Sequence, residues 1–186
     1  MLATRRFLWN ILLRMKHTLG IATILALLIS SSFAAEPASP PAAAAARSAS
    51  ARVFDEVADT ALAAMSKRAE ELKISGAAVV AYIEGDSTKG WSSKMVVVGK
   101  MANAPTEKNR GVNLLAIAYT KAAEMADTLK DSGNAGRPPM AGETGYKGGA
   151  IKKCKTGYLI AAFSGGPAES DFKVSQAGLE VLATKL

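Results

Sequence analysis

A pair of glycines between an apolar run and an amphipathic run is the first feature of the sequence that could bind a ligand. The stretch FSGGPAESD, residues 163–171, follows the run GYLIAAF and precedes the run FKVSQAGLEVL. Glycine allows a sharp reversal where a side chain would clash, and proline suits the first turn of a helix, where its missing N–H is not needed. We therefore expect Ser164, Gly165 and Gly166 to form a strand-to-helix elbow whose backbone N–H groups can receive an anion. In the alternative, Asp171 accepts those hydrogen bonds and the elbow is purely structural.

A cluster of lysines surrounds the one cysteine of the chain. Cys154 is flanked by Lys152, Lys153 and Lys155. Neighbouring cations favour the thiolate form of a cysteine, and lysines can pair with the carboxylates or phosphates of a ligand. Two alternatives remain open: a half-buried cysteine without chemistry, and a solvated strand edge whose charges prevent pairing between sheets.

Residue counts exclude several classes of site. The one histidine, His17, lies in the N-terminal leader, so a protein without its leader has no histidine for metal sites, Ser-His-Asp triads or Cys-His dyads. A lone cysteine excludes an internal disulfide and zinc sites that need several cysteines. Four of the 23 basic residues lie in the first sixteen positions, and no basic run interleaved with aromatic residues follows. Nucleic acid is therefore not the expected partner.

The N-terminus has the pattern of a signal peptide. A basic beginning is followed by an apolar stretch over residues 19–29 and by small residues at Ser32 and Ala34. We expect cleavage after Ala34, so that residues 1–34 direct export to the periplasm or the medium. Met15 is an alternative start of translation. An uncleaved anchor is the other possibility, and the leader would then be the chain's contact with a membrane.

The remainder of the chain divides into a linker and a folded part. Residues 35–52 are dominated by proline, alanine and serine, which predicts a flexible linker, and residues 53–186 are long enough for a single core. Hydrophobic periodicity predicts helices over 53–73, 110–131 and 168–185, and strands over 77–83, 91–101, 150–153 and 157–163, with a glycine-rich loop over 133–149.

The order of these elements predicts an α+β fold. Strands joined by short turns favour antiparallel pairing, so we expect an antiparallel sheet of about four to five strands packed with three main helices. Gly178 lies within the apolar stripe of the last helix. Because glycine in a helix costs stability unless the backbone must approach another element closely, we expect this helix to lie flat on the sheet there.

The C-terminal stretch resembles a known family. GGAIKKCKTGYLIAAFSGGPAESDFKVSQAGLEVL is similar to the C-terminal half of the GlcG/HbpS-like haem-binding family, which is related to the C-terminal domain of PduO-type corrinoid proteins. The matching positions are Gly148-Gly149, Gly157, Ser164-Gly165 and Asp171. In addition, AYTKAAEMA, residues 118–126, looks like the family's Lys-Ala-x-x-Ala helix, with Lys121 as its lysine. The resemblance covers about residues 53–186 and is most specific in the last forty.

This resemblance implies an α+β fold with an antiparallel sheet, assembly into a homo-oligomer, and binding of haem, a corrinoid or a small organic acid. The sequence departs from the family where Ala150-Ile151 replaces its proline after the paired glycines. A histidine ligand to haem iron cannot transfer, so methionine, tyrosine or thiolate must be considered. Met140 and Tyr146, in the glycine-rich loop, and Cys154 are the candidates.

We therefore expect an exported protein that binds haem or a related tetrapyrrole without catalysis of its own. Gly165, Gly166, Lys121 and Lys153 would receive the ligand's carboxylates, and the glycine-rich loop would form a wall. One alternative is an enzyme or sensor module for a small anionic organic molecule, with Lys121 or Cys154 as the reactive group. The other is a structural or interaction module with no ligand.

Overall fold

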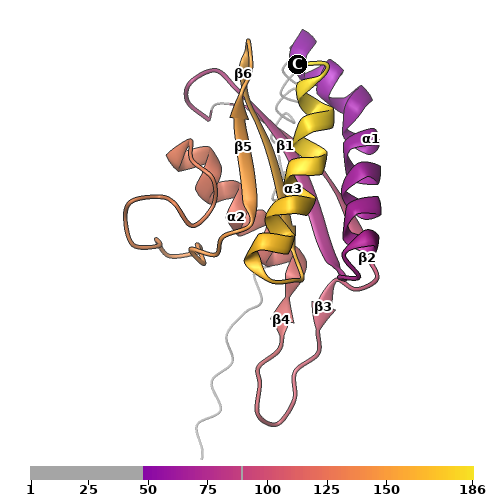
Figure 1. Ribbon diagram of the computed structural model, residues 1–186. Helices are drawn as coiled ribbons and strands as arrows, with labels where there is room; N and C mark the ends of the chain where they lie inside the picture. The colour runs from indigo at the N-terminus through magenta and orange to yellow at the C-terminus, as the bar shows by residue number, and fades with distance from the viewer. Residues whose placement is uncertain (1–47, 89) are drawn as a thin grey trace, which may run out of the picture. The chain divides into compact units, whose positions relative to one another are not determined.

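The computed structural model describes residues 48–88 and 90–186 (Figure 1). The described residues belong to one compact unit. The predicted signal peptide, residues 1–34, and the predicted linker as far as residue 47 lie outside the described residues. Within the described part of the chain, no helix combines the length and the hydropathy needed to cross a membrane.

A four-stranded antiparallel sheet lies at the centre of the unit. Its strands are β1 (Gly76–Glu84), β2 (Trp91–Val98), β5 (Gly149–Lys153) and β6 (Gly157–Ser164), in the order β2-β1-β6-β5. Every neighbouring pair is antiparallel. A second, two-stranded sheet consists of β3 (Ala102–Asn103) and β4 (Val112–Asn113). The α+β fold with an antiparallel sheet is thus confirmed.

Helices cover both faces of the central sheet (Figure 1). The helices α1 (Ala49–Glu71) and α3 (Ala168–Ala183) pack on one face, and α2 (Leu114–Thr128) packs on the other. The central strand β1 alternates between the two cores: Val80 and Tyr82 face α1 and α3, whereas Val79 and Ile83 face α2. A strand covered on both sides is apolar throughout, which explains the unbroken apolar run that predicted this strand.

Helix boundaries differ from the prediction where a capping residue decides them. The first helix begins at Ala49 rather than 53, because the Ser48 hydroxyl accepts a hydrogen bond from the Ala51 N–H at 3.1 Å. Residues 49–52, which the prediction gave to the linker, are therefore helical. The second helix begins at Leu114 rather than 110, where the Asn113 side chain caps it. It ends at Thr128 because Leu129 adopts a left-handed conformation, with φ of 54°.

The predicted strand over 91–101 is too long. The Lys100 N–H donates to the Val98 carbonyl at 2.9 Å, and this tight turn takes the chain out of the central sheet. The chain then forms an arm, residues 99–113, whose base is the β3–β4 pair and which extends away from the central sheet (Figure 1). No hydrophobic pattern in the sequence predicts these two-residue strands.

Gly178 marks a close approach, but to a helix and not to the sheet. A Cβ atom at this position would lie 2.5 Å from Sδ of Met65, which belongs to α1 and is fully buried. The expectation that α3 lies flat on the sheet at Gly178 was therefore wrong, because the element it approaches there is α1. The glycine instead allows the backbone of α3 to pack against α1.

Candidate functional site

A pocket of about 440 Å³ lies where β6 ends and α3 begins. The end of β6 and the first turn of α3 form one side, and α2, the arm and the glycine-rich loop complete the lining. The lining residues are Asn103, Val112, Leu114, Ile117, Lys121, Gly145, Tyr146, Lys147, Ser164, Gly165, Gly166, Ala168 and Asp171. Five of the seven predicted ligand-binding residues are thus brought together: Lys121, Tyr146, Ser164, Gly165 and Gly166.

A buried ion pair lies at the base of this pocket. Nζ of Lys121, a residue only 1% exposed, donates to Oδ2 of Asp171 at 2.8 Å and to the Phe163 carbonyl at 2.7 Å. The pair joins α2 to the first turn of α3 and to the end of β6. These two hydrogen bonds leave one of the three N–H bonds of the ammonium group without a partner among the described residues.

Burial and pairing act in opposite directions on the two charges. Burial lowers the pKa of Lys121 and raises the pKa of Asp171, because a charged group loses its hydration in the interior. The mutual attraction of the two charges opposes both shifts. For Asp171, the backbone N–H groups of Gly166 and Gly165 oppose the shift as well, since they stabilise the carboxylate.

The elbow glycines do not present free N–H groups to a ligand. The Gly166 N–H donates to Oδ1 of Asp171 at 2.8 Å. The expectation that this amide receives an external anion was therefore wrong, and the alternative with Asp171 as the internal acceptor holds for it. Gly165 has a different role, since a Cβ atom there would clash with the carbonyl oxygen of Ser75. It lets β6 leave the sheet against the backbone that precedes β1.

Backbone N–H groups without a partner in the helix occur just after the elbow, in the first turn of α3. Its N-cap residue is Pro167, which supplies no side-chain hydrogen bond to the first turn. The N–H groups at the start of a helix have no partner within the helix and carry a partial positive charge. Ala168, the first residue of α3, lines the pocket and is exposed.

Lys147 supplies a cation beside these donors. It lines the pocket, is exposed, and has no ion-pair partner among the described residues. The sequence analysis did not single it out, although its place in the glycine-rich loop was a usable signal. The arm residues Asn103 and Val112 were also missed, and no local pattern could have placed them at the elbow.

The side chain of Ser175, from α3, holds the elbow in place through two hydrogen bonds. Its hydroxyl group donates to the Gly148 carbonyl at 2.6 Å and accepts from the Phe163 N–H at 3.0 Å. The side chain is fully buried and ties α3 to β6 and to the end of the glycine-rich loop. By contrast, the hydroxyl group of Ser164 makes no hydrogen bond to the described residues, so it is available to a ligand in the pocket.

Two predicted ligand-binding residues are not part of this pocket. Met140 is 51% exposed in the glycine-rich loop and does not line it. Lys153 pairs with Tyr158 across the β5–β6 ladder, six residues from Ser164 along β6, which is about 20 Å in a strand. Its ammonium group contacts Oδ1 of Asp86 at 3.2 Å, and this carboxylate raises the pKa of Lys153.

Cys154 also lies away from the pocket. It is half-buried at the end of β5, where its N–H donates to the Gly157 carbonyl at 2.8 Å, and it packs at the border of the core between the sheet and α1–α3. Among the described residues, no group of three or more histidine, cysteine, aspartate or glutamate side chains could hold a metal ion.

Comparison with known proteins finds a solved structure of distantly similar fold. No family model and no curated protein matches the sequence. The chain is similar to the crystal structure of Klebsiella pneumoniae protein ORFY, described by the family model DUF336, which is the GlcG-like family. The two are 16% identical, with a TM-score of 0.43, over 69% of this chain and 88% of that one. This is a distant likeness of fold and does not assign the chain to a family.

Proposed function

We propose that residues 48–186 form a ligand-binding domain, and that its ligand is an organic molecule with a carboxylate group. The observation that carries this proposal is the meeting of Lys147 with the uncapped first turn of α3 in one pocket. An anion there gains hydrogen bonds from backbone N–H groups, the favourable end of the helix dipole and a lysine charge. The Lys121–Asp171 pair beneath is neutral as a whole and does not repel it.

Haem or a related tetrapyrrole is the first ligand to test, because its propionates are carboxylates and the C-terminal motif resembles a haem-binding family. A pocket of about 440 Å³ would take the carboxylate edge of the macrocycle. Tyr146 is the one predicted axial ligand that lines the pocket, and it is 57% exposed, so its phenol can reach a ligand. Met140 and Cys154 have no such placement.

Binding without catalysis is supported by the position of the two candidate reactive groups. The Lys121 amine is held by two hydrogen bonds at the base of the pocket, and Cys154 lies outside it. We further propose that the leader directs export and that the mature protein is a homo-oligomer. The leader's sequence pattern and the motif resemblance support these two proposals.

The test is a titration of residues 35–186 with haemin, followed in the Soret band. We expect a saturable Soret shift and a change of its position in Tyr146→Phe. Lys147→Gln is expected to weaken binding about tenfold, because one charge contact is lost. Lys155→Gln is the matched control, since Lys155 is also exposed but does not line the pocket.

The absence of a Soret shift would contradict haem as the ligand. The wider proposal of a carboxylate ligand would then be tested with small organic acids in the same variants. If Lys147→Gln and Lys155→Gln bound haemin with equal affinity, and also bound the organic acids with equal affinity, the pocket would not be the site.

A further inference from the structure

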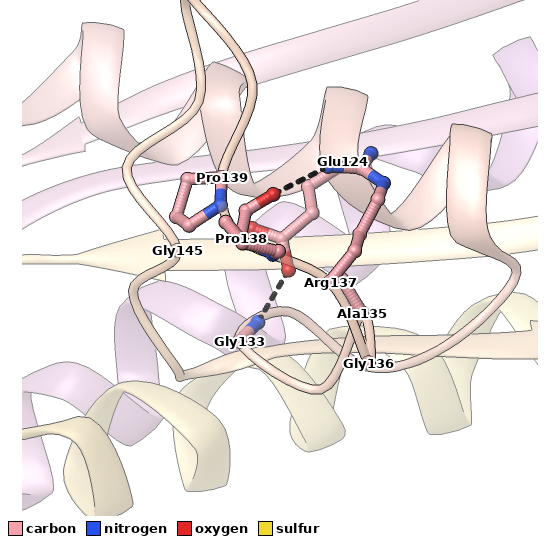
Figure 2. A pocket seen from close by; sticks show the side chains of 8 residues that line it. All are labelled: Glu124, Gly133, Ala135, Gly136, Arg137, Pro138, Pro139 and Gly145. Atoms are coloured by element: carbon pink, nitrogen blue, oxygen red, sulfur yellow. Dashed lines mark hydrogen bonds between the residues drawn. The ribbon is translucent and has the colours of Figure 1, made fainter.

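A second pocket, of about 420 Å³, lies between α2 and the glycine-rich loop (Figure 2). Glu124 lines it from α2, one helical turn after Lys121. The other lining residues all belong to the loop: Gly133, Ala135, Gly136, Arg137, Pro138, Pro139 and Gly145. Lys121 does not line this pocket, and Gly145 is the residue common to the linings of both pockets.

Glu124 carries an incompletely paired carboxylate. The residue is 1% exposed, and its Oε1 accepts a hydrogen bond from the Gly133 N–H at 2.7 Å (Figure 2). Its Oε2 is buried and has no hydrogen-bond partner; no other buried side-chain nitrogen or oxygen of the described residues shares this condition. A buried carboxylate oxygen without a donor is costly, so such an oxygen indicates a missing partner.

Hydrogen bonds of Arg137 and Glu143 hold the loop that lines this pocket in place. Arg137 donates to both carboxylate oxygens of Glu143, at 2.7 and 2.9 Å, and to Oδ2 of Asp127 at 2.7 Å. Oε2 of Glu143 also accepts from the Met140 N–H at 2.8 Å. These bonds fix the loop to α2, and none of the printed hydrogen bonds of the Arg137 guanidinium group goes to Glu124.

The chemistry of the lining selects the kind of partner. A carboxylate oxygen pairs best with a charged N–H donor, because such hydrogen bonds are the strong ones. A divalent metal ion would need several oxygen or nitrogen ligands, and the described residues offer no such group here. Ala135, Pro138 and Pro139 present apolar surface instead, which suits the carbon chain of an organic cation.

We propose that this pocket binds the primary ammonium group of a small organic cation, and that the Glu124 carboxylate turns toward the pocket so that its Oε2 accepts the hydrogen bond. The apolar surface of the loop receives the alkyl part. This second site is separate from the proposed carboxylate site and does not depend on it, since its charge is opposite and its acceptor differs.

The test is an NMR titration of residues 35–186 with n-butylammonium chloride, observed at the Gly133 and Ala135 amides. We expect a saturable shift of both signals. Tetramethylammonium has the same charge but no N–H donor, so it should not produce that shift. Butylammonium binding should weaken at least tenfold in Glu124→Gln and remain unchanged in Glu180→Gln, an exposed glutamate on α3.

Three results would overturn the proposal: no saturable shift with butylammonium, equal binding of tetramethylammonium, or equal affinity in Glu124→Gln. The comparison of the two cations uses the unaltered protein, so it decides the question even if Glu124→Gln fails to fold.

Discussion

At the scale of single residues, the centre of the molecule is the Lys121–Asp171 pair. Taking two charges out of water is expensive, and their attraction and hydrogen bonds offset that cost only while both partners are present. Asp171 thus acts as an internal anion for the Gly166 amide, and Lys121 keeps that anion in place. The pair shapes the pocket without itself being the exposed cation.

Removing one partner should therefore be severe. Lys121→Met leaves a buried carboxylate unpaired and is expected to lower the free energy of unfolding by about 3–5 kcal/mol, measured by urea denaturation. The double variant Lys121→Met with Asp171→Leu should recover much of the loss, because neither charge remains. Lys130→Met is the control, because Lys130 is an exposed lysine just after α2. Its free energy of unfolding should stay within about 0.5 kcal/mol of the wild-type value. A single variant as stable as this control would contradict a structural role for the pair.

The sequence predicts residue roles where they follow from local chain geometry. The turn at the elbow, the competition from Asp171 and the place of Lys121 in a helix could all be inferred from neighbouring residues. The positions of Lys153 and Met140 relative to the pocket could not, since they depend on strand direction and on the path of a long loop. Lys147 and Glu124 acquire their roles only through tertiary contacts.

At the scale of elements, the helices and central strands follow from periodicity, since each buries a regular stripe or face. The arm was missed because two-residue strands have no period to detect. The glycine-rich loop has more order than its composition indicates, because the bonds of Arg137 and Glu143 close it on itself and on α2.

Acid should release this loop. The pKa of Glu143 is lowered from its ordinary value of 4.5 to about 2. The hydrogen bonds from Arg137 are the larger cause, and the hydrogen bond from the Met140 N–H is the next. Because the folded-state pKa is the lower one, the carboxylate stabilises the closed loop above pH 4.5, and this contribution is lost as the pH falls toward 2. Hydrogen exchange at the Met140 amide should accelerate, relative to its intrinsic rate, over that range.

Glu143→Gln is the control for the acid response, since it has no carboxylate to protonate. Its Met140 amide should exchange faster at pH 6 than in the wild type and should show no further opening between pH 4.5 and 2. A wild-type amide whose protection is constant across this range would contradict the role of Glu143.

At the scale of the whole molecule, a three-layer arrangement positions the site. The sheet ends in the elbow, α2 lies on one face and α3 begins on the other, so Lys121 and Asp171 meet across the end of β6. The leader over residues 1–34 and the linker as far as residue 47 lie outside the described residues and remain predictions.

Export gives a prediction for the intact chain. Expressed with its leader in a bacterial host, the protein should be found outside the cytoplasm with Ala35 as its first residue, because small residues at Ser32 and Ala34 suit signal-peptide cleavage. Intact-mass spectrometry of the exported fraction measures this directly. A product that keeps its leader and stays with the membrane would favour the anchor instead.

The most direct test of the proposed carboxylate site is an NMR titration of residues 35–186 with succinate. The account predicts saturable shifts of the Ala168, Glu169 and Ser170 amides at the start of α3, with affinity about tenfold weaker in Lys147→Gln. Shifts that never saturate, or that occur at other basic surfaces and not at these three amides, would contradict it.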